Sequence, residues 1–366
     1  MTISIARPDL GDEEIAAVAD VIRSGMIASG PKVAEFERAF AEYCGAKYAI
    51  ATSNGTTSLH AGMLAAGIGP GDEVIVPAFT FFATASTVSM CGARPVFADV
   101  DRRTFTLDPA SVLEAITPRT KAVMGVHLFG QPFDVDALGE ICADQKLLLF
   151  EDAAQAHGAE HRGRRVGSLG TFGSFSFYPT KNMTTGEGGM VTTNDPEVAR
   201  RTRLFVNHGQ SEKYLHTVIG YNFRMTDIGA AIGLVQLGKL EGYNARRIAA
   251  ARYYDAHLDA PGLVTPAASP AVRHVYHQYV VTVGDGSPLP RDELMQYLGR
   301  KGIGSAVHYP IPLPDQPVYR ELAGTACPVS ADLAGRVLSL PVHPGVGDRE
   351  LDEVCDAVNG AAGAGA

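Results

Sequence analysis

The sequence has 366 residues, enough for two domains and a sizeable core, because a domain averages roughly 150 residues. Hydrophobic residues make up 46% and charged residues 19%, which excludes a wholly disordered chain and a coiled coil. The 31 basic and 40 acidic residues give a net charge of -9, which argues against a broad surface for nucleic acid or for anionic membranes.

Neither the cysteines nor the apolar segments indicate export or membrane insertion. The 5 cysteines are scattered without a C-x-x-C pair, so we expect no disulfide framework, no zinc ribbon and no bound metal. The first residues lack the basic and apolar regions of a signal peptide, and the most apolar stretch, 74–90, is interrupted by Pro77 and by polar residues. We therefore expect a cytoplasmic protein without a membrane span.

Short apolar runs alternate with amphipathic segments from residue 48 onward, a pattern typical of a parallel sheet covered by helices. The runs of strand length are Tyr48–Ala51, Glu73–Val76, Pro95–Ala98, Ala122–Val126, Leu147–Phe150, Gly173–Phe177 and Met190–Thr193. The helical patterns are Thr56–Ala66, Phe81–Cys91, Pro109–Ile116, Val135–Gln145 and Pro196–Val206. These elements predict one large α/β domain, which we assign to residues 1–245.

The rest of the chain predicts a smaller α+β domain, residues 246–366. A long helix-forming segment, Asp227–Leu258, leads out of the large domain. The predicted pieces beyond it are a strand at His277–Val283, a helix at Arg291–Lys301, a Pro-rich connection at Tyr309–Pro317 and a final helix at Arg349–Val358. The tail 360–366 has little apolar surface, and we expect it to be mobile.

Several common catalytic and binding motifs are absent from the sequence. There is no G-x-x-x-x-G-K-[ST] and no G-x-S-x-G, and the pair Gly67 and Gly69 lacks the third glycine of a dinucleotide fingerprint. Two histidine pairs lack the glutamate of a helical zinc-protease motif, and we interpret them as loop or surface histidines: His157 with His161, and His274 with His277.

The segment Ala51–Ser58 is a candidate phosphate site between a strand and a helix. Free N–H groups at a helix N-terminus, beside small residues such as Gly55 and Thr56, form a cradle for an anion. Taken alone, this segment favours the simpler interpretation that Ser53 or Asn54 caps the helix.

The segment Pro77–Thr84 places aromatic rings after the strand that ends at Val76. A ring at the carboxyl edge of a sheet can stack on a flat heteroaromatic cofactor, because open α/β sheets bind ligands at that edge. Core packing is the more frequent role of such rings, so a stacking role for one of these phenylalanines depends on evidence from the neighbouring segments.

The segment Leu147–Gln155 is an apolar strand that runs into two carboxylates, Glu151 and Asp152. Burial at the sheet edge demands a partner for at least one carboxylate, and a protonated pyridine nitrogen is a suitable one. Gln155 could hydrogen-bond another ring substituent. Capping of the next helix by a carboxylate explains this segment equally well.

The segment Gly173–Asn182 places Lys181 directly after a strand. Strand alternation puts Phe175 and Phe177 on one face and the hydroxyls of Ser174 and Ser176 on the other, where they can face a phosphate. A lysine beside apolar walls can have a depressed pKa, which suits its amine to Schiff-base formation. Most lysines, in contrast, only solvate a surface.

Together, these segments resemble the DegT/DnrJ/EryC1/StrS family of pyridoxal-phosphate (PLP) sugar aminotransferases. The resemblance also rests on Gly220–Asp227 and Val307–Pro310, and it extends from Gly11–Glu14 and Gly30–Val33 to Leu338–Pro341. It implies the aspartate-aminotransferase type of fold (fold type I), with a large, mostly parallel-sheet cofactor domain and a smaller α+β C-terminal domain.

The resemblance also implies roles for individual residues. Lys181 would form the Schiff base and move protons, and Asp152 would pair with the pyridinium nitrogen. Phe81 would stack on the ring, where many members have Trp, and Gln155 would contact the ring, where His is frequent. The remaining implied roles are phosphate binding by Gly55, Thr56 and Ser176, contact with the neighbouring subunit's cofactor by Asn222, and substrate binding by Arg224, His308 and Tyr309. Arg224 could instead pair with a helix carboxylate such as Asp227.

The implied reaction is amino transfer, with glutamate as donor, to a nucleotide-diphosphate-linked keto-sugar in a homodimer with shared active sites. The short N-terminal lead into Gly11–Glu14 resembles the branch that acts on 4-keto-6-deoxyhexoses. A 3-keto sugar or a keto-cyclitol as acceptor remains open. PLP-dependent sugar dehydration is a further alternative, although the relatives known for it carry His where this chain has Lys181. A regulatory protein is the least favoured alternative, because no helix-turn-helix region or basic patch is visible.

Overall fold

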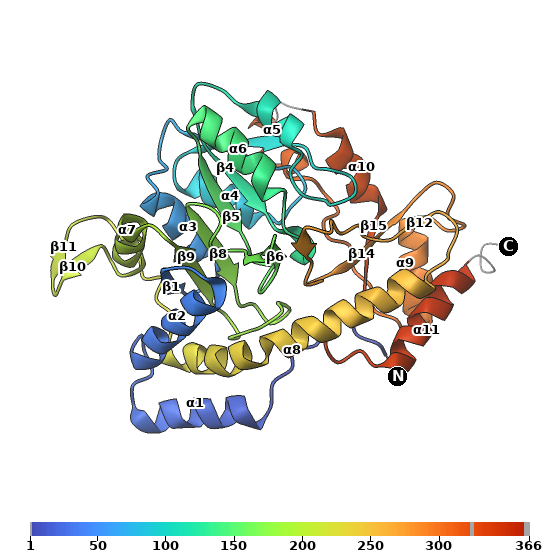
Figure 1. Cartoon of the computed structure of the whole chain (residues 1–366), viewed down its shortest axis with the longest axis horizontal. Helices are drawn as coiled ribbons and strands as arrows, with labels where there is room; N and C mark the ends of the chain where they lie inside the picture. The colour runs from blue at the N-terminus through green and yellow to red at the C-terminus, as the bar shows by residue number, and fades with distance from the viewer. Residues whose placement is uncertain (1, 323–325, 362–366) are drawn as a thin grey trace.

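The computed structural model describes residues 2–322 and 326–361 and is built around a seven-stranded sheet (Figure 1). Its strand order is β1-β9-β8-β5-β4-β2-β3. The strands are β1 (Tyr48–Thr52), β2 (Glu73–Pro77), β3 (Arg94–Ala98), β4 (Thr120–Val126), β5 (Leu148–Asp152), β8 (Phe172–Ser176) and β9 (Gly189–Thr193). Strand β9 is antiparallel to both of its neighbours, and the other pairings are parallel. The predicted large, mostly parallel sheet is confirmed.

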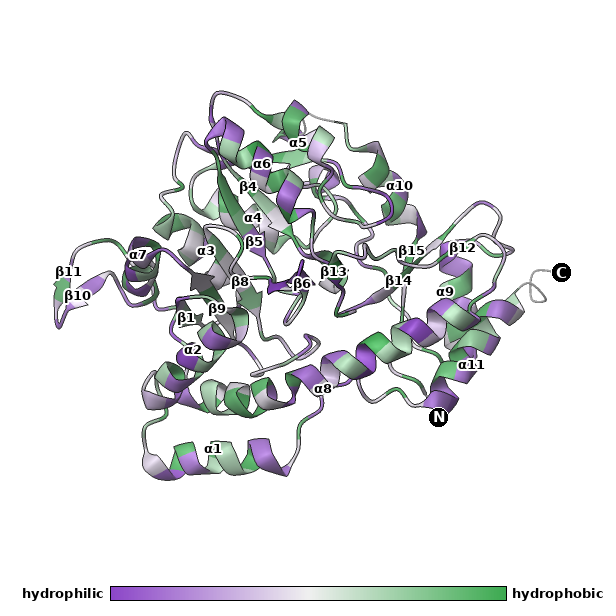
Figure 2. Ribbon diagram, in the orientation of Figure 1, coloured by the Kyte–Doolittle hydropathy of each residue, from purple (hydrophilic) through white to green (hydrophobic). Residues whose placement is uncertain are grey.

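Helices cover both faces of this sheet, because alternate apolar side chains of each strand point to opposite sides (Figure 2). One face packs against α3 (Gly55–Ala65), α4 (Ala83–Met90) and α7 (Pro196–Val206). The other face packs against α2 (Pro31–Cys44), α5 (Pro109–Ala115) and α6 (Val135–Gln145). Figure 2 shows the central strands mostly in green, as expected for a sheet buried on both faces.

Some boundaries differ from the prediction in ways that matter for the site. Helix α4 begins at Ala83, so Phe81 lies in the turn before the helix rather than in its first turn. Strand β5 extends to Asp152, so the carboxylate is the last strand residue. The helices α1 (Asp12–Ser24) and α2 are not among the predicted elements.

The long helix α8 (Asp227–His257) runs beneath the sheet towards the C-terminal part of the chain (Figure 1). The predicted domain boundary, between residues 245 and 246, falls inside this helix and stays a prediction. The C-terminal part contains the sheet β12 (Leu263–Val264), β14 (Tyr279–Val283) and β15 (Val337–Leu340). It also contains α9 (Arg291–Arg300), α10 (Pro328–Arg336) and α11 (Asp348–Asn359), and the 3-10 turns Leu313–Asp315 and Arg320–Leu322. Of the tail predicted to be mobile, residues 362–366 lie outside the described residues.

Shorter strands complete the fold. Strands β13 (Val272–Arg273), β6 (Glu160–His161) and β7 (Arg164–Arg165) form a small sheet that joins the C-terminal part to the segment after β5. Strands β10 (Gln210–Glu212) and β11 (Leu215–His216) form a hairpin that projects from the molecule beyond α7 (Figure 1).

The N-terminal segment packs against the C-terminal part of the chain. The backbone N–H of Ile3 donates to the Gly302 carbonyl (2.8 Å), and the N–H of Gly304 donates to the Ile3 carbonyl (2.8 Å). Ile3 is buried in the same apolar cluster as Tyr254 of α8. The chain then leads to α1, which packs along α8.

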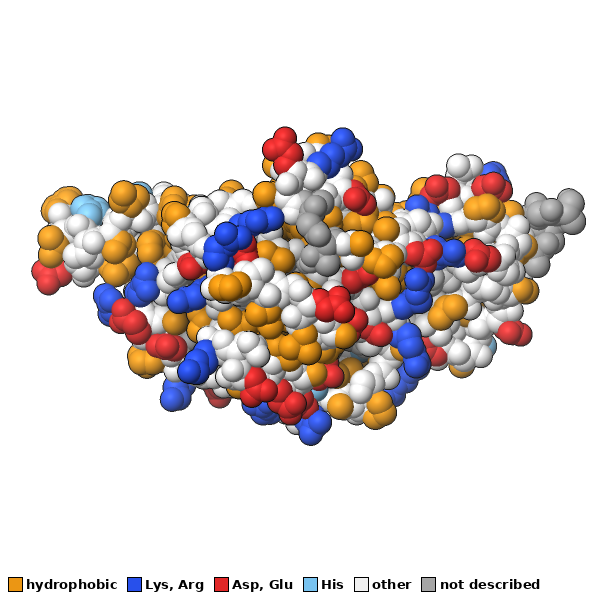
Figure 3. Space-filling model, turned by 90° about the horizontal axis from the view of Figure 1, so that it is seen from above, with side chains coloured by type: hydrophobic (Ala, Val, Ile, Leu, Met, Phe, Trp, Pro, Cys, Tyr) orange, Lys and Arg blue, Asp and Glu red, His pale blue; other side chains and the backbone are white. Residues whose placement is uncertain are grey.

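The surface carries charges of both signs. On the face that Figure 3 shows, Lys and Arg side chains are interspersed with Asp and Glu side chains, and hydrophobic side chains lie between them. Within residues 2–322 and 326–361, no helix is both long enough and apolar enough to cross a membrane.

Candidate functional site

A cavity of about 740 Å³ lies where the carboxyl ends of the central strands face the C-terminal part of the chain. This is the edge at which open α/β sheets bind ligands. Most of the predicted site residues line the cavity, namely Gly55, Thr56, Phe81, Asp152, Gln155, Ser176, Lys181, His308 and Tyr309. Segments as far apart in the sequence as Gly55 and Tyr309 therefore meet in one place.

The N-terminus of α3 forms one wall of the cavity. Asn54 is the N-cap residue, and its Oδ1 accepts the backbone N–H of Thr57 (2.9 Å), so the local capping interpretation is confirmed. Gly55 and Thr56 are the first two residues of the helix, where the N–H groups have no intrahelical acceptor. A Cβ added to Gly55 would lie 2.7 Å from the Cβ of Ser176, so only glycine lets the helix approach the end of β8 this closely. The wall thus combines free N–H groups, a hydroxyl and the positive helix end, which together suit a phosphate.

The two neighbouring carboxylates of β5 have different surroundings. Asp152 is buried at the cavity, where its Oδ2 accepts the Thr84 hydroxyl (2.8 Å) and its Oδ1 accepts the Ala154 N–H (3.2 Å). Burial raises the pKa of Asp152, although both hydrogen bonds oppose this. Glu151 points to the other face of the sheet. It accepts the N–H groups of residues 167, 169 and 170, and it lies 3.1 Å from His127 Nε2.

Asp152 therefore does not cap a helix. Glu151 stabilises the loop of residues 167–170 through its hydrogen bonds. Within the described residues, the side-chain oxygens of Asp152 accept only from the Thr84 hydroxyl and the Ala154 N–H, so this buried carboxylate has no cationic group in direct contact. A protonated pyridine nitrogen is a partner that would offset the cost of this burial.

Lys181 lies in a turn after β8, where its backbone N–H donates to the Tyr178 carbonyl (2.9 Å). Burial of the amine lowers the pKa of Lys181 to about 8, while the Asp152 carboxylate opposes the shift. A lysine with this pKa is neutral in a substantial fraction of molecules near pH 8, so its amine can act as a nucleophile.

The charge of Lys181 acts on three histidines, namely His157, His277 and His308. Of the histidines interpreted as loop or surface residues, His157, His274 and His277 lie in loops and His161 lies in β6. None of the four is a surface residue, because all are at most 6% exposed. Burial lowers the pKa of His157 to about 3, and burial with the positive charge of Lys181 lowers the pKa of His277 well below its ordinary value. These imidazoles are therefore neutral near pH 7. Their apolar-lined loop positions gave no sequence signal for this burial.

Gln155 and the aromatic residues form the opposite wall. Gln155 Oε1 accepts the Phe129 N–H (2.7 Å), and Gln155 Nε2 donates to the Tyr309 hydroxyl (3.0 Å). The ring of Phe81 is 54% exposed and lies at the cavity with its centroid 5.9 Å from that of Tyr309. An exposed apolar ring at a cavity leaves a face free for a flat ligand.

The residues present fit PLP by their own chemistry. The α3 terminus can take its phosphate, Asp152 can take its protonated ring nitrogen, and Lys181 offers a nucleophilic amine for its aldehyde. The close approach of Gly55 to Ser176 is the observation that tests this fit most directly, since a Cβ would fill the cradle.

Asn222 and Arg224 are not among the residues that line the cavity. Asn222 is exposed on the segment after the β10–β11 hairpin. Arg224 donates from Nη1 to Asn207 Oδ1 (2.7 Å), so it does not pair with Asp227 as the alternative expected. Asp227 instead accepts the backbone N–H groups of Gly30, Lys32 and Val33.

Other cavity residues were not predicted from the sequence. Ile5 and Ala6 of the N-terminal segment line the cavity, as do His277 and Glu187. Thr84 was placed in the predicted helix, but its contact with Asp152 joins residues 68 positions apart. A local sequence pattern cannot indicate contacts between residues so far apart in the chain, so these contacts became visible only in the structure.

The comparisons with known proteins agree with the geometry. The sequence model of the DegT/DnrJ/EryC1/StrS aminotransferase family matches residues 8–359. The GDP-perosamine synthase of Caulobacter vibrioides is 43% identical, with 98% of this chain and 97% of that protein covered. The dTDP-3-amino-3,4,6-trideoxy-alpha-D-glucose transaminase of Streptomyces venezuelae is 40% identical, with 98% of this chain and 94% of that protein covered. The crystal structure of S. venezuelae DesV in complex with a ketimine intermediate has a TM-score of 0.91 and 41% identity, with 96% and 94% covered.

Proposed function

This chain belongs to the DegT/DnrJ/EryC1/StrS aminotransferase family, and on that basis we propose that it transfers an amino group from glutamate to a nucleotide-diphosphate-linked 4-keto-6-deoxyhexose. As a member of the family it is a PLP-dependent aminotransferase with the fold-type-I architecture, as the resemblance implied. The observation that carries the proposal is one cavity that holds Lys181, Asp152 and the α3 cradle together, in a chain similar to a GDP-perosamine synthase over nearly its whole length.

Lys181 and Asp152 are proposed to act on the cofactor directly. PLP, when bound, acts as an electron sink at the carbon that loses its proton. The amine of Lys181 moves the proton between the carbon and nitrogen sites, and its lowered pKa supports this role because a neutral amine can accept a proton. Asp152, as a carboxylate held by Thr84 and Ala154, keeps the ring nitrogen protonated.

Gly55, Thr56 and Ser176 are proposed to bind the phosphate, and the free N–H groups of the α3 terminus support this assignment. Phe81 is proposed to stack on the ring, and Gln155 to donate to a ring substituent. The hydrogen bond from Phe129 to Gln155 Oε1 fixes the amide orientation, which leaves Nε2 as the donor that faces Tyr309 and the cavity.

His308, Tyr309 and Arg224 are proposed to bind the sugar substrate. His308 and Tyr309 border the cavity, and His308 Nδ1 lies 3.0 Å from the Ser339 hydroxyl, which orients its ring. Asn222 is proposed to reach the cofactor phosphate of a second subunit in a homodimer. Its exposure next to the projecting hairpin supports a role outside its own cavity.

The acceptor can be identified by incubating the PLP-loaded enzyme with glutamate and a panel of dTDP-, GDP- and UDP-linked keto-sugars. We expect 2-oxoglutarate to form with a 4-keto-6-deoxyhexose, and NMR of the product to show nitrogen on C4. Lys181→Ala should abolish turnover, while Lys121→Ala, at an exposed lysine of β4, should not. The absence of 2-oxoglutarate with every acceptor would contradict the proposal.

A 3-keto sugar is the second candidate acceptor. It is favoured by the similarity to the dTDP-3-amino-3,4,6-trideoxy-alpha-D-glucose transaminase. The same NMR measurement separates the two candidates, because nitrogen on C3 assigns the second and excludes the first.

The shared active site can be tested by mixing two inactive variants. Subunits with Lys181→Ala and subunits with Asn222→Ala should recover part of the activity after they are unfolded and refolded together, because one site of each mixed dimer is intact. Separate refolding of each variant is the control, and equal activity of mixed and separate samples would contradict shared sites.

A further inference from the structure

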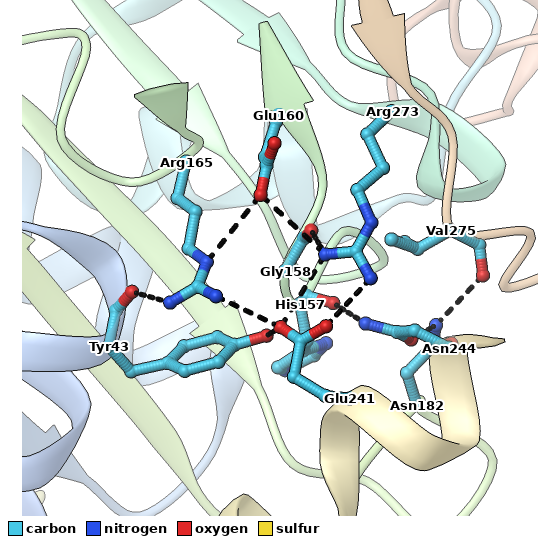
Figure 4. A network of polar contacts seen from close by, with 10 residues as sticks. All are labelled: Tyr43, His157, Gly158, Glu160, Arg165, Asn182, Glu241, Asn244, Arg273 and Val275. Atoms are coloured by element: carbon cyan, nitrogen blue, oxygen red, sulfur yellow. Dashed lines mark hydrogen bonds and ion pairs between the residues drawn. The ribbon is translucent and has the colours of Figure 1, made fainter. Parts of the chain in front are cut away.

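Two buried asparagine side chains tie the Lys181 turn to helix α8 (Figure 4). Asn182 Nδ2 donates to Asn244 Oδ1 (2.9 Å), and Asn244 Nδ2 donates to the backbone carbonyl of His157 (2.8 Å). We propose that Asn244, acting through Asn182, is a positioning residue that fixes the Lys181 amine relative to Asp152. This inference rests on the role proposed above for Lys181.

The amide pair joins the segments that form the reacting side of the cavity. His157 follows Asp152 by five positions, so the contact from Asn244 holds the chain that leaves β5. The second hydrogen of the Asn182 amide goes to the Val275 carbonyl (3.1 Å), just before cavity residue His277. The two asparagines together thus connect helix α8, the lysine turn, the segment after Asp152 and the segment before His277.

Stability alone gives little reason for this pair. Asn182 is 2% exposed and Asn244 is 0% exposed, and within the described residues Asn182 Oδ1 has no hydrogen-bond partner. A buried amide pair with an unpaired oxygen adds little net stability, and apolar groups of similar shape could replace it at small cost. The hydrogen bonds of the amide pair are directional, in contrast to an apolar contact. They therefore fix the lysine turn, the segment after Asp152 and the segment before His277 in one relative position.

Helix α8 is itself held in register beside the amide pair. Glu241, one turn before Asn244, accepts the Tyr43 hydroxyl (2.7 Å) and pairs with Arg165 (3.0 Å) and Arg273 (2.7 Å) (Figure 4). These contacts hold α8 against α2 and against the small sheet β13-β6-β7, and none of them involves the amide pair.

The backbone near His157 also fits the amide pair closely. A Cβ added to Gly158, whose φ is +79°, would lie 2.2 Å from Tyr43 Oη and 2.8 Å from Asn244 Nδ2. The residue after His157 must therefore be glycine for Asn244 to reach the His157 carbonyl.

Glu241 supplies a matched control for the test. Among the described residues, its hydrogen bonds and ion pairs involve Tyr43, Arg165 and Arg273, and none of them reaches the Lys181 turn. A Glu241→Gln variant should therefore weaken contacts of α8 with α2 and with the small sheet, while both hydrogen bonds of the amide pair stay in place.

The experiment measures the reactivity of Lys181 in the full-length apoprotein. Trinitrobenzenesulfonate is applied at a series of pH values, and the modified peptide that contains Lys181 is quantified by mass spectrometry. In the wild type, half-maximal labelling should fall near pH 8. In Asn244→Ala and in Asn182→Ala, the pH of half-maximal labelling should rise by about one unit, because an amine released from its buried position is better hydrated. Labelling at pH 8 should consequently fall roughly fivefold.

The control variant and the double variant decide the interpretation. Glu241→Gln should lower the melting temperature but keep the wild-type labelling profile, and Asn182→Ala with Asn244→Ala should shift it no further than either change alone. An unshifted profile in Asn244→Ala, or asparagine variants that do not fold while Glu241→Gln does, would overturn the positioning role. Because labelling uses neither PLP nor sugar, a failure of the transamination assay leaves this result readable.

Discussion

The buried amine of Lys181 should destabilise the apoprotein at neutral pH. Its pKa falls from 10.5 to about 8 on folding, as the net result of burial and the opposing attraction of Asp152. Since one pKa unit corresponds to about 1.36 kcal/mol, the folded state loses about 3 kcal/mol wherever the amine is charged in both states. Lys181→Met removes this cost and should raise the melting temperature of the apoprotein by about 4 °C at pH 7, given ~2.1 cal/mol/K per residue.

The pH dependence gives this prediction its sharpest test. Because the unfolded chain holds the proton more tightly, wild-type stability should rise as the pH increases from about 8 to 10.5. The difference between Lys181→Met and wild type should therefore be full at pH 7 to 8 and vanish near pH 10.5. Scanning calorimetry of both apoproteins across this range measures it, with Lys121→Met as the control at an exposed lysine. The reasoning would be refuted if the stability difference between Lys181→Met and wild type stayed constant with pH, or if wild type were more stable than Lys181→Met at pH 7.

Three further changes test the cavity and its support. Gly55→Ala should weaken PLP binding at least roughly tenfold in a fluorescence titration, because its Cβ would meet Ser176 at 2.7 Å, while Gly139→Ala, which meets nothing within 4 Å, should bind normally. Glu151→Gln should destabilise the apoprotein by about 2 kcal/mol in urea unfolding, since the carboxylate accepts backbone N–H groups, and an unchanged midpoint would contradict this. Burial raises the pKa of Asp152 in the folded state, so the wild-type apoprotein should lose stability as the pH rises above 3.8, where the unfolded chain releases this proton first. The Asp152→Asn apoprotein should not show this loss and should therefore become more stable than wild type. The same variant should fail to keep bound PLP active.

The sequence predicted the elements that depend on local order. The strands were recognisable because each is a short apolar run, which placed Asp152 and Lys181 near the carboxyl edge. The local pattern left other roles open for both residues, and only the family resemblance implied their functions. Contacts between distant segments were not predictable. The hydroxyl of Thr84 reaches Asp152 across 68 positions, and Asn182 reaches Asn244 across 62 positions, so neither pairing leaves a local pattern.

Strand β5 shows how one local rule separates a structural from a functional acid. Successive side chains of a strand point to opposite faces, so Glu151 and Asp152 cannot both enter the cavity. Glu151 faces residues 167–170, where it accepts three backbone N–H groups, and it also contacts His127. These contacts hold the loop before β8, the strand that precedes Lys181. Asp152 lines the cavity and, among the described residues, accepts only two hydrogen bonds, from Thr84 and Ala154, so it keeps acceptor capacity at the proposed cofactor site. A one-residue shift in the register of β5 would turn Asp152 towards the loop and Glu151 towards the cavity, so both the loop contacts and the cavity carboxylate depend on this register.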